Sequence, residues 1–314
     1  MESKAESLSI IVPCYNEEEN IQKFYETLIN QNDDIKKLDY EIIFVDDGSK
    51  DSSILEVKKL QKIDSKVRLI KFSRNFGKES AMLAGLKASK KNLVTIMDCD
   101  LQDPPSLLFE MLKIYEENNG KIKMIIAKRK NRAGESKIRA YLSNLFYRLN
   151  NAISKVRLVS GVRDFRLMSR EVVESIIQMN EYHRFSKAIF EFVGYEKRYL
   201  EYEYISRTQG VSKWSFMNLF SYGIEGIISF STAPLKIITI IGFLIFLISS
   251  IYGFYIIIST LIFGNPVKGY PSTIVLISFF GGLQIIMLGI IGEYIARIYE
   301  QGKNRPHYFI EYED

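Results

Sequence analysis

Two uncharged, apolar stretches near the C-terminus constrain the fold of this chain more than any other feature. No Asp, Glu, Lys or Arg occurs from residue 237 to 267 or from residue 269 to 292. About 20 apolar residues are enough for a helix to cross a bilayer, and both stretches exceed the usual length of a globular helix. Two buried core helices are the alternative. We predict a hairpin of two transmembrane helices within residues 236–296, at about 237–263 and 270–292.

The positive charges around this hairpin predict its orientation. Lys236 precedes the first stretch, and Arg297, Lys303 and Arg305 follow the second, whereas Lys268 is the one charge between them. Flanks rich in Lys and Arg stay in the cytoplasm. We therefore predict a multi-pass protein of the cell membrane with its soluble domain and both termini in the cytoplasm.

Length and composition bound the remaining possibilities. A chain of 314 residues is long enough for one complete α/β domain and a smaller unit. The first seven residues are mostly polar or charged, so no secretory signal is expected before the first predicted strand. Cys14 and Cys99 suit a reducing compartment and indicate neither a disulfide framework nor a zinc site. The net charge of +5 suits an anionic membrane surface but is too small to indicate nucleic acid binding.

Strands alternate with helices through the first two thirds of the chain. Apolar runs predict strands at 8–13, 40–45, 67–72, 93–97 and 123–127, and the segments between them contain helices such as 79–88. This alternation predicts βαβ units, and hence an α/β, Rossmann-like and mostly parallel sheet, in a cytoplasmic domain over residues 1–212. A further strand is predicted at 196–206. No G-x-G-x-x-G or Walker A loop occurs, which argues against a dinucleotide dehydrogenase and a P-loop kinase.

Acidic residues follow the fourth predicted strand. Asp98, Asp100 and Asp103 lie within six positions before two prolines. Polar groups at the carboxyl ends of strands in an open α/β sheet face a ligand crevice. One carboxylate of the pair Asp98 and Asp100 can bind a hard divalent cation while the other accepts from a sugar hydroxyl, and Gln102 adds a neutral oxygen. The alternative is an acidic turn that caps the next helix.

Other polar residues end the neighbouring strands. Tyr15 can stack on a base, Asp47 can accept from a base or ribose, and Arg129 can meet phosphate. Their recurrence at one edge of the sheet favours a shared crevice for a nucleotide. Asp164 stands between two arginines, which fits either a neutralised structural partner or a catalytic group.

Three later segments point to the membrane surface. The apolar stripe of a predicted helix at 134–154 can face either the core or lipid. A basic, glycine-containing loop at 207–214 can fold over phosphates or meet lipid headgroups. Residues 213–235 hold one acidic residue and predict amphipathic juxtamembrane helices. Residues 297–314 form the predicted cytoplasmic tail.

Six motifs occur in an order that resembles the polyprenyl-phosphate glycosyltransferases, which are inverting enzymes of glycosyltransferase family 2 with a GT-A fold. Bactoprenol glucosyltransferases and dolichol-phosphate mannose synthases are the relatives that the chain resembles. The resemblance extends from about residue 8 to residue 306. The motifs are the segments 13–17, 46–49, 73–78, 98–105, 164–168 and 209–214.

This resemblance implies roles for individual residues. The nucleotide sugar would be bound by residues from several strand ends, namely Pro13, Tyr15, Glu17, Val45, Asp47, Lys78, Asp98 and Cys99. A Mg²⁺ or Mn²⁺ ion would be held by Asp100 and Gln102. Phosphates of the donor or acceptor would be met by Arg129, Arg166, Arg207, Ser212 and Lys213. Asp100, through the metal, and Asp164 would be the catalytic residues.

Asp164 matches the position of a proposed general base, but two observations leave its role open. Arg163 stands where relatives often have glycine, and pairing with it would depress the basicity of Asp164. A lipid phosphate monoester has a second pKa near 6, so the acceptor is already largely a dianion at neutral pH. Asp164 is therefore either a base or an organiser of a cationic acceptor pocket, with Arg166 as its partner.

The resemblance implies transfer of one hexose from UDP-glucose to undecaprenyl phosphate at the cytoplasmic face of the bilayer. The alternatives are another donor, such as UDP-GlcNAc, UDP-GalNAc, GDP-mannose or a modified pentose, and a nonenzymatic membrane scaffold. Relatives also imply a homotetramer. No partner nucleic acid is expected.

Overall fold

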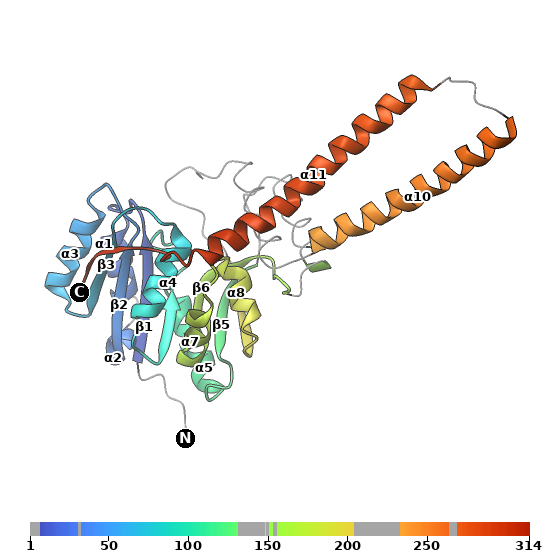
Figure 1. Ribbon diagram of the computed structural model, residues 1–314. Helices are drawn as coiled ribbons and strands as arrows, with labels where there is room; N and C mark the ends of the chain where they lie inside the picture. The colour runs from blue at the N-terminus through green and yellow to red at the C-terminus, as the bar shows by residue number, and fades with distance from the viewer. Residues whose placement is uncertain are drawn as a thin grey trace.

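The computed structural model describes residues 7–30, 33–130, 148, 151–152, 156–203, 233–263 and 269–314 (Figure 1). Its strands are β1 Ser7–Cys14, β2 Asp39–Asp46, β3 Val67–Phe72, β4 Leu93–Ile96, β5 Met124–Arg129, β6 Val162–Ser169, β7 Lys197–Tyr202 and β8 Ile310–Glu313. Its helices are α1 Ile21–Asn30, α2 Asp33–Lys37, α3 Ser53–Ile63, α4 Lys78–Ala88, α5 Leu107–Glu117, α7 Arg170–Gln178, α8 Ser186–Phe192, α10 Ala233–Phe263 and α11 Tyr270–Gly302.

All these strands form one sheet in the order β7-β5-β6-β4-β1-β2-β3-β8. β1 pairs in parallel with β2 and β4, β2 with β3, and β5 with β7. The prediction of an α/β, Rossmann-like and mostly parallel sheet is therefore confirmed. β6 departs from the simple βαβ pattern because it lies antiparallel between β4 and β5.

Helices cover both faces of the sheet, which explains why the central strands are continuous apolar runs. On one face, Ile10 packs with Phe24 of α1 and with side chains of α3 and α5. On the other face, the next residue, Ile11, packs with α4, α7 and α8. A side chain at Gly85 of α4 would lie 2.2 Å from the side chain of Ile11, so this glycine permits the close approach of α4 to β1. The two cores hold the carboxyl ends of the strands in fixed positions.

α10 and α11 extend together away from the sheet (Figure 1). Their apolar side chains are largely exposed, including Phe254 at 70% and Leu261 at 81%. Exposed apolar surface on this scale marks contact with lipid or another apolar surface. Among the described residues, one helical segment, Phe279–Gly302, is long and apolar enough to cross a membrane. α10 begins four residues before the predicted start at 237 and ends at the predicted residue 263, whereas α11 begins at the predicted residue 270 and continues to Gly302, ten residues beyond the predicted end at 292.

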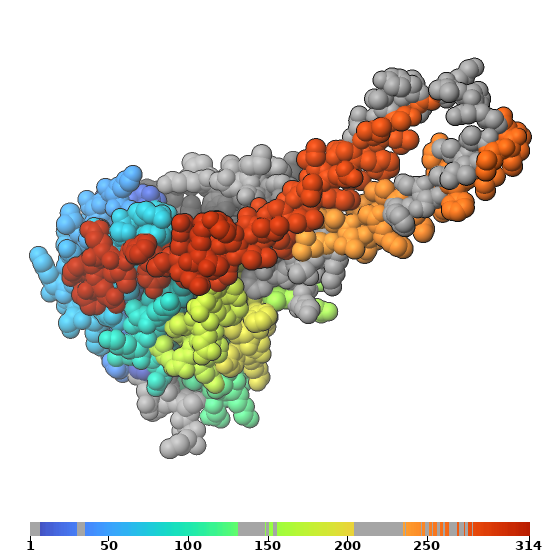
Figure 2. Space-filling model, viewed as in Figure 1, coloured from blue at the N-terminus to red at the C-terminus, as the bar shows by residue number. Residues whose placement is uncertain are grey.

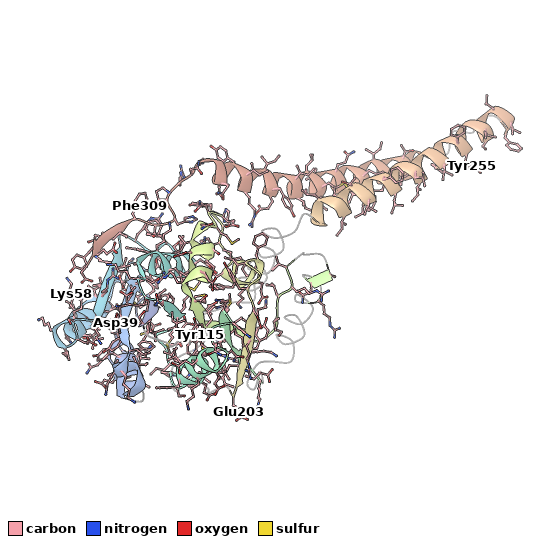
Figure 3. The ribbon with its side chains drawn as sticks, turned by 90° about the horizontal axis from the view of Figure 1, so that it is seen from below. Asp39, Lys58, Tyr115, Glu203, Tyr255 and Phe309 are labelled. Carbon is pink, nitrogen blue, oxygen red and sulfur yellow. The ribbon has the colours of Figure 1, made fainter. Side chains whose placement is uncertain are left out.

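The last residues of the chain return to the sheet as β8, which the sequence analysis had assigned to a cytoplasmic tail. β8 pairs antiparallel with β3. The amide of Ser73 donates to the carbonyl of Phe309 at 3.0 Å, and Tyr308 stacks on Phe72 with ring centroids 4.8 Å apart. Figure 2 shows this red segment lying across one face of the domain, and Figure 3 places Phe309 beside the sheet, far from Tyr255 on the hairpin. β8 thus connects the end of α11 to the edge of the sheet.

Replacing Tyr308 with alanine is expected to lower the stability of the domain by roughly 1–3 kcal/mol, because the variant loses the stacked ring and its packing against the core. The melting temperature of the purified protein should fall by several degrees. Tyr308→Phe keeps the ring and is the matched control. Equal melting temperatures for the two variants would show that the contact between the tail and Phe72 does not contribute to stability.

Candidate active site

The loop after β4 carries the central acidic residues. The amide of Met97 still donates to Ile11 of β1 at 2.9 Å, and the chain then leaves the sheet. Leu101 adopts a left-handed conformation with a φ of 55°, which is unusual for a residue with a branched side chain. The amide of Gln102 donates to the carboxylate of Asp100 at 3.2 Å. This tight turn keeps Asp100 and Gln102 close together at the edge of the sheet.

Strand register brings Asp164 to the same edge. Ile96, the last residue of β4, lies opposite Arg166 of the antiparallel β6. Asp164 precedes Arg166 by two residues, so it lies beyond the end of β4, as Asp98 does. The sequence separation between these two aspartates gave no indication of this proximity.

Lys78 lies between the two aspartates. Its ammonium nitrogen is 2.6 Å from an oxygen of Asp98 and 2.8 Å from an oxygen of Asp164. The side chain of Lys78 is 42% exposed, whereas those of Asp98 and Asp164 are 23% and 21% exposed, so the group borders solvent. Three segments of the chain therefore meet at one cation.

Arg163 continues this network toward the acidic loop. Its guanidinium lies 3.1 Å from Asp103 and 3.9 Å from Asp98. The sequence analysis considered a pair between Arg163 and Asp164; the side chain of Arg163 instead pairs with Asp103, and the ion-pair partner of Asp164 is Lys78. Arg163 and Asp164 are adjacent on β6, and successive side chains of a strand point to opposite faces, so the two do not face each other.

Arg129, the last residue of β5, is the next member of this network of charged side chains. It donates to the side-chain oxygen of Gln102 at 3.2 Å and lies 3.7 Å from Asp103. The hydroxyl of Tyr202 donates to Asp103, which is only 5% exposed. Tyr202 was not singled out from the sequence, and Asp103 was named only as one of three acidic residues after β4, because the partners of both lie on distant strands. Alternating charges thus run from Asp164 to the loop that bears Asp100.

The surrounding cations determine the protonation of Asp164. Burial alone would raise its pKa, but the positive charges of Lys78, Lys187 and Arg166 outweigh burial and hold the pKa well below its usual range. For Asp98, burial raises the pKa despite the opposing charge of Lys78. A carboxylate with so low a pKa is a weak proton acceptor near neutral pH. The surrounding cations therefore keep Asp164 ionised near neutral pH.

Arg166 does not lie among the exposed phosphate-binding candidates. Its side chain is 1% exposed and donates to the carbonyl oxygens of Arg163 at 2.7 Å and Asp164 at 3.1 Å. The ring of Phe190 lies 3.5 Å from the guanidinium carbon. Burial lowers the pKa of Arg166 to about 10. Arg166 consequently shapes the backbone that presents Asp164.

Asp47 orders the loop that carries Lys78. Its carboxylate accepts from the amides of Phe76 at 2.6 Å and Gly77 at 2.9 Å, and its side chain is 4% exposed. The neighbouring Gly48 has a φ of 71°, and a side chain there would lie 2.5 Å from the carbonyl carbon of Arg74. Both features fix the approach of the loop 73–78 to the end of β2.

The other nucleotide-binding candidates differ in accessibility. Tyr15 is 42% exposed at the carboxyl end of β1, where a base can stack on it. Pro13 is partly buried, whereas the side chains of Val45 and Cys99 are 0% and 2% exposed and can offer a ligand only their backbone. Glu17 lines a depression of about 450 Å³ formed by residues 16–20, 50 and 51, which contains none of Lys78, Asp98 or Asp164.

Several predicted features lie outside the described residues. These are the phosphate candidates Arg207, Ser212 and Lys213, nearly all of the predicted helix at 134–154 and nearly all of the amphipathic segment at 213–235.

The donor set of the acidic loop suits a magnesium-like ion. No group of three His, Cys, Asp or Glu residues able to hold a metal occurs within the described residues. Mg²⁺ usually binds through one or two carboxylates, water and the phosphates of the substrate, without a cage made entirely of protein. Asp100 supplies a carboxylate and Gln102 an amide oxygen, which are hard ligands on one turn. These residues fit an ion that arrives with a diphosphate.

Comparison with known proteins places this site in context. The family profile "Glycosyl transferase family 2" matches residues 9–177, and the profile "GtrB C-terminal hairpin" matches residues 233–298. The SfII prophage-derived bactoprenol glucosyl transferase of Shigella flexneri is 42% identical over 304 residues, which are 97% of this chain and 97% of the relative. The bactoprenol glucosyl transferase of Shigella phage SfV is 42% identical over 306 residues, which are 98% of each chain.

Among solved structures, mannosyl-3-phosphoglycerate synthase from Rubrobacter xylanophilus aligns with a TM-score of 0.48 and 16% identity, over 70% of this chain and 71% of that chain. The near-complete sequence matches confirm the resemblance identified from the six motifs.

Proposed function

Because this chain belongs to glycosyl transferase family 2, we propose that it transfers one hexose from UDP-glucose to undecaprenyl phosphate with inversion at the anomeric carbon. The observation that carries this proposal is 42% identity to bactoprenol glucosyl transferases over 97% of the chain. The site adds chemical support, since Lys78, Asp98 and Asp164 meet at the carboxyl edge of the sheet.

In the proposed reaction, an oxygen of the acceptor phosphate attacks the anomeric carbon of the sugar. A new carbon–oxygen bond forms while the bond to the diphosphate breaks, and its electron pair leaves with the nucleoside diphosphate. The acceptor is already largely a dianion at neutral pH, so it needs positioning more than deprotonation. Asp164, ionised and bound to Lys78, would keep the cations of the site oriented for this attack.

Asp100 and Gln102 would hold Mg²⁺ or Mn²⁺. The ion would act as a Lewis acid that offsets negative charge on the departing diphosphate. Arg129, which already contacts Gln102, is placed beside this position and would meet a donor phosphate. Tyr15 would stack on the nucleobase.

The site would work at the membrane surface. The bactoprenol glucosyl transferase relatives imply a membrane-associated protein. We infer that α10 and α11 both cross the bilayer, because their exposed surfaces are apolar. We also infer that the catalytic domain and both termini lie in the cytoplasm, because more Lys and Arg residues lie at the ends of these helices near the domain than in the loop between them. The contact of Gln301 with the backbone of Tyr182 at 2.7 Å would then hold the domain against the membrane.

A transfer assay tests the reaction. Detergent-purified protein is incubated with undecaprenyl phosphate, Mn²⁺ and one radiolabelled nucleotide sugar from a panel that includes UDP-glucose, UDP-GlcNAc, UDP-GalNAc and GDP-mannose. We expect label to enter the lipid phase from UDP-glucose and to be lost with EDTA. Label from a different donor would refute the choice of sugar. Failure of folded protein with every donor would favour a nonenzymatic scaffold.

A further inference from the structure

Lys187 supplies one of the positive charges that lower the pKa of Asp164, but it takes part in none of the ion pairs described above. Lys187, in the first turn of α8, is partly buried and makes no hydrogen bond or ion pair with another of the described residues. Of the neighbouring charges, Glu191 accepts from Lys197, whereas Arg184 donates to the carbonyl of Met179 at 2.6 Å and its buried Nε has no hydrogen-bond partner.

Two contacts fix α8 against the segments that build the site. Ser186 donates its amide, at 3.1 Å, and its hydroxyl to Glu79, which directly follows Lys78 in the chain. Phe190 lies under the guanidinium of Arg166, which in turn donates to the carbonyl of Asp164. Lys187 lies between these two anchors of the same short helix. Its placement is therefore determined by the loops that present Lys78 and Asp164.

The segment before α8 is attached to the domain-proximal end of α11. The amide of Tyr182 donates to the side chain of Gln301 at 2.7 Å, the amide group of Gln301 donates to the carbonyl of Asn180 at 2.8 Å, and His183 pairs with Glu300. Figure 1 shows α8 close to the place where the helical hairpin meets the catalytic domain. α8 thus lies on the side of Asp164 from which a lipid phosphate would arrive.

We propose that Lys187 is a binding residue for the acceptor, and that its ammonium group contacts the phosphate of the polyprenyl phosphate beside Asp164. This inference rests on the proposed function. The chemistry requires such a group, because Lys78 is neutralised by two carboxylates and Arg163 by Asp103. A phosphate dianion needs cations that are not already paired with carboxylates. Lys187 also adds to the positive field that keeps Asp164 ionised.

The experiment compares the full-length Lys187→Ala and Lys187→Arg variants with the wild type in detergent. A hydrogen bond between charged groups contributes enough to change binding by about 10- to 100-fold. We therefore expect the KM for undecaprenyl phosphate to rise by about 10- to 100-fold in Lys187→Ala, with the Kd for the nucleotide sugar unchanged and the KM largely restored in Lys187→Arg. The matched control is Lys113→Ala, which removes an exposed lysine from α5.

A second measurement does not depend on turnover. Equilibrium binding of undecaprenyl phosphate is compared with binding of undecaprenol, which lacks the phosphate. The wild type should prefer the phosphate, and this preference should shrink by the same factor in Lys187→Ala. An unchanged preference, or a Kd for the nucleotide sugar that rises in parallel with the acceptor KM, would overturn the assignment. If the wild type binds undecaprenyl phosphate but transfers no sugar, the proposed function fails and this binding comparison decides the role of Lys187.

Discussion

The Asp100→Asn variant is expected to lose about 1,000-fold or more in kcat for sugar transfer while its melting temperature stays close to that of the wild type. The change removes a negative charge from the turn formed with Gln102 but keeps a side chain that can still accept from that amide. Lewis-acid stabilisation of a leaving group contributes several kcal/mol, and each 1.36 kcal/mol corresponds to a factor of about ten in rate. Single-turnover transfer of label from UDP-glucose measures the effect.

A matched control variant distinguishes the loss of a metal ligand from the loss of any negative charge on the same domain. Glu110→Gln removes an exposed carboxylate from α5 of the same domain and should leave kcat unchanged. Titration with Mn²⁺ in the presence of UDP should show weaker metal binding by Asp100→Asn. Normal turnover by this variant would remove Asp100 from the metal site.

Replacing Lys78 with methionine is expected to lower kcat by about 100- to 1,000-fold, the usual cost of removing a preorganised charged group from an active site. In the variant, the carboxylates of Asp98 and Asp164 face each other without the cation that now lies 2.6 Å and 2.8 Å from them. Repulsion between like charges raises the pKa of one member of such a pair.

The pH dependence of the Lys78→Met variant follows from the same change. Burial raises the pKa of Asp164, yet Lys78 and other cations hold it well below its usual range, so the wild type keeps this group ionised far into the acid range. Any contribution of ionised Asp164 to folding or activity is lost as the pH falls through its folded pKa. Without Lys78 this loss occurs at a higher pH.

A profile of kcat against pH tests this prediction. The acid limb of the profile should move to higher pH in Lys78→Met. Lys87→Met, which removes an exposed lysine from the same helix, should leave the limb in place. A limb at the same pH in all three proteins would mean that Lys78 does not control the ionisation of Asp164.

Much of the architecture is encoded in local sequence patterns. Apolar runs placed both ends of β1 to β4 to within one residue, because strands buried on both faces contain few polar residues. The turn of Asp100 and Gln102 was predictable because its residues are close in sequence. Long uncharged segments likewise predicted α10 and α11, since only a helix satisfies the backbone of so long an apolar stretch in lipid.

Other features depend on contacts between distant segments. β8 was missed because a strand of only four residues, two of them acidic, has little local signal. Its pairing with β3 follows only after α11 has brought the chain back to the sheet. The partner of Arg163 could not be chosen from sequence, because Asp103 and Asp164 are both acidic and only the pleat of β6 distinguishes them.

By itself the sequence determined the α/β class of the domain, the helical hairpin and the acidic turn. Each of these depends on the alternation of apolar runs, on the length of an uncharged segment or on the spacing of acidic residues, which are all properties of residues close together in the chain. The tertiary structure alone decided that Lys78 lies between Asp98 and Asp164. The physical reason is strand register. The antiparallel pairing of Ile96 with Arg166 brings two distant segments to one edge of the sheet, and no local pattern in either segment specifies that pairing.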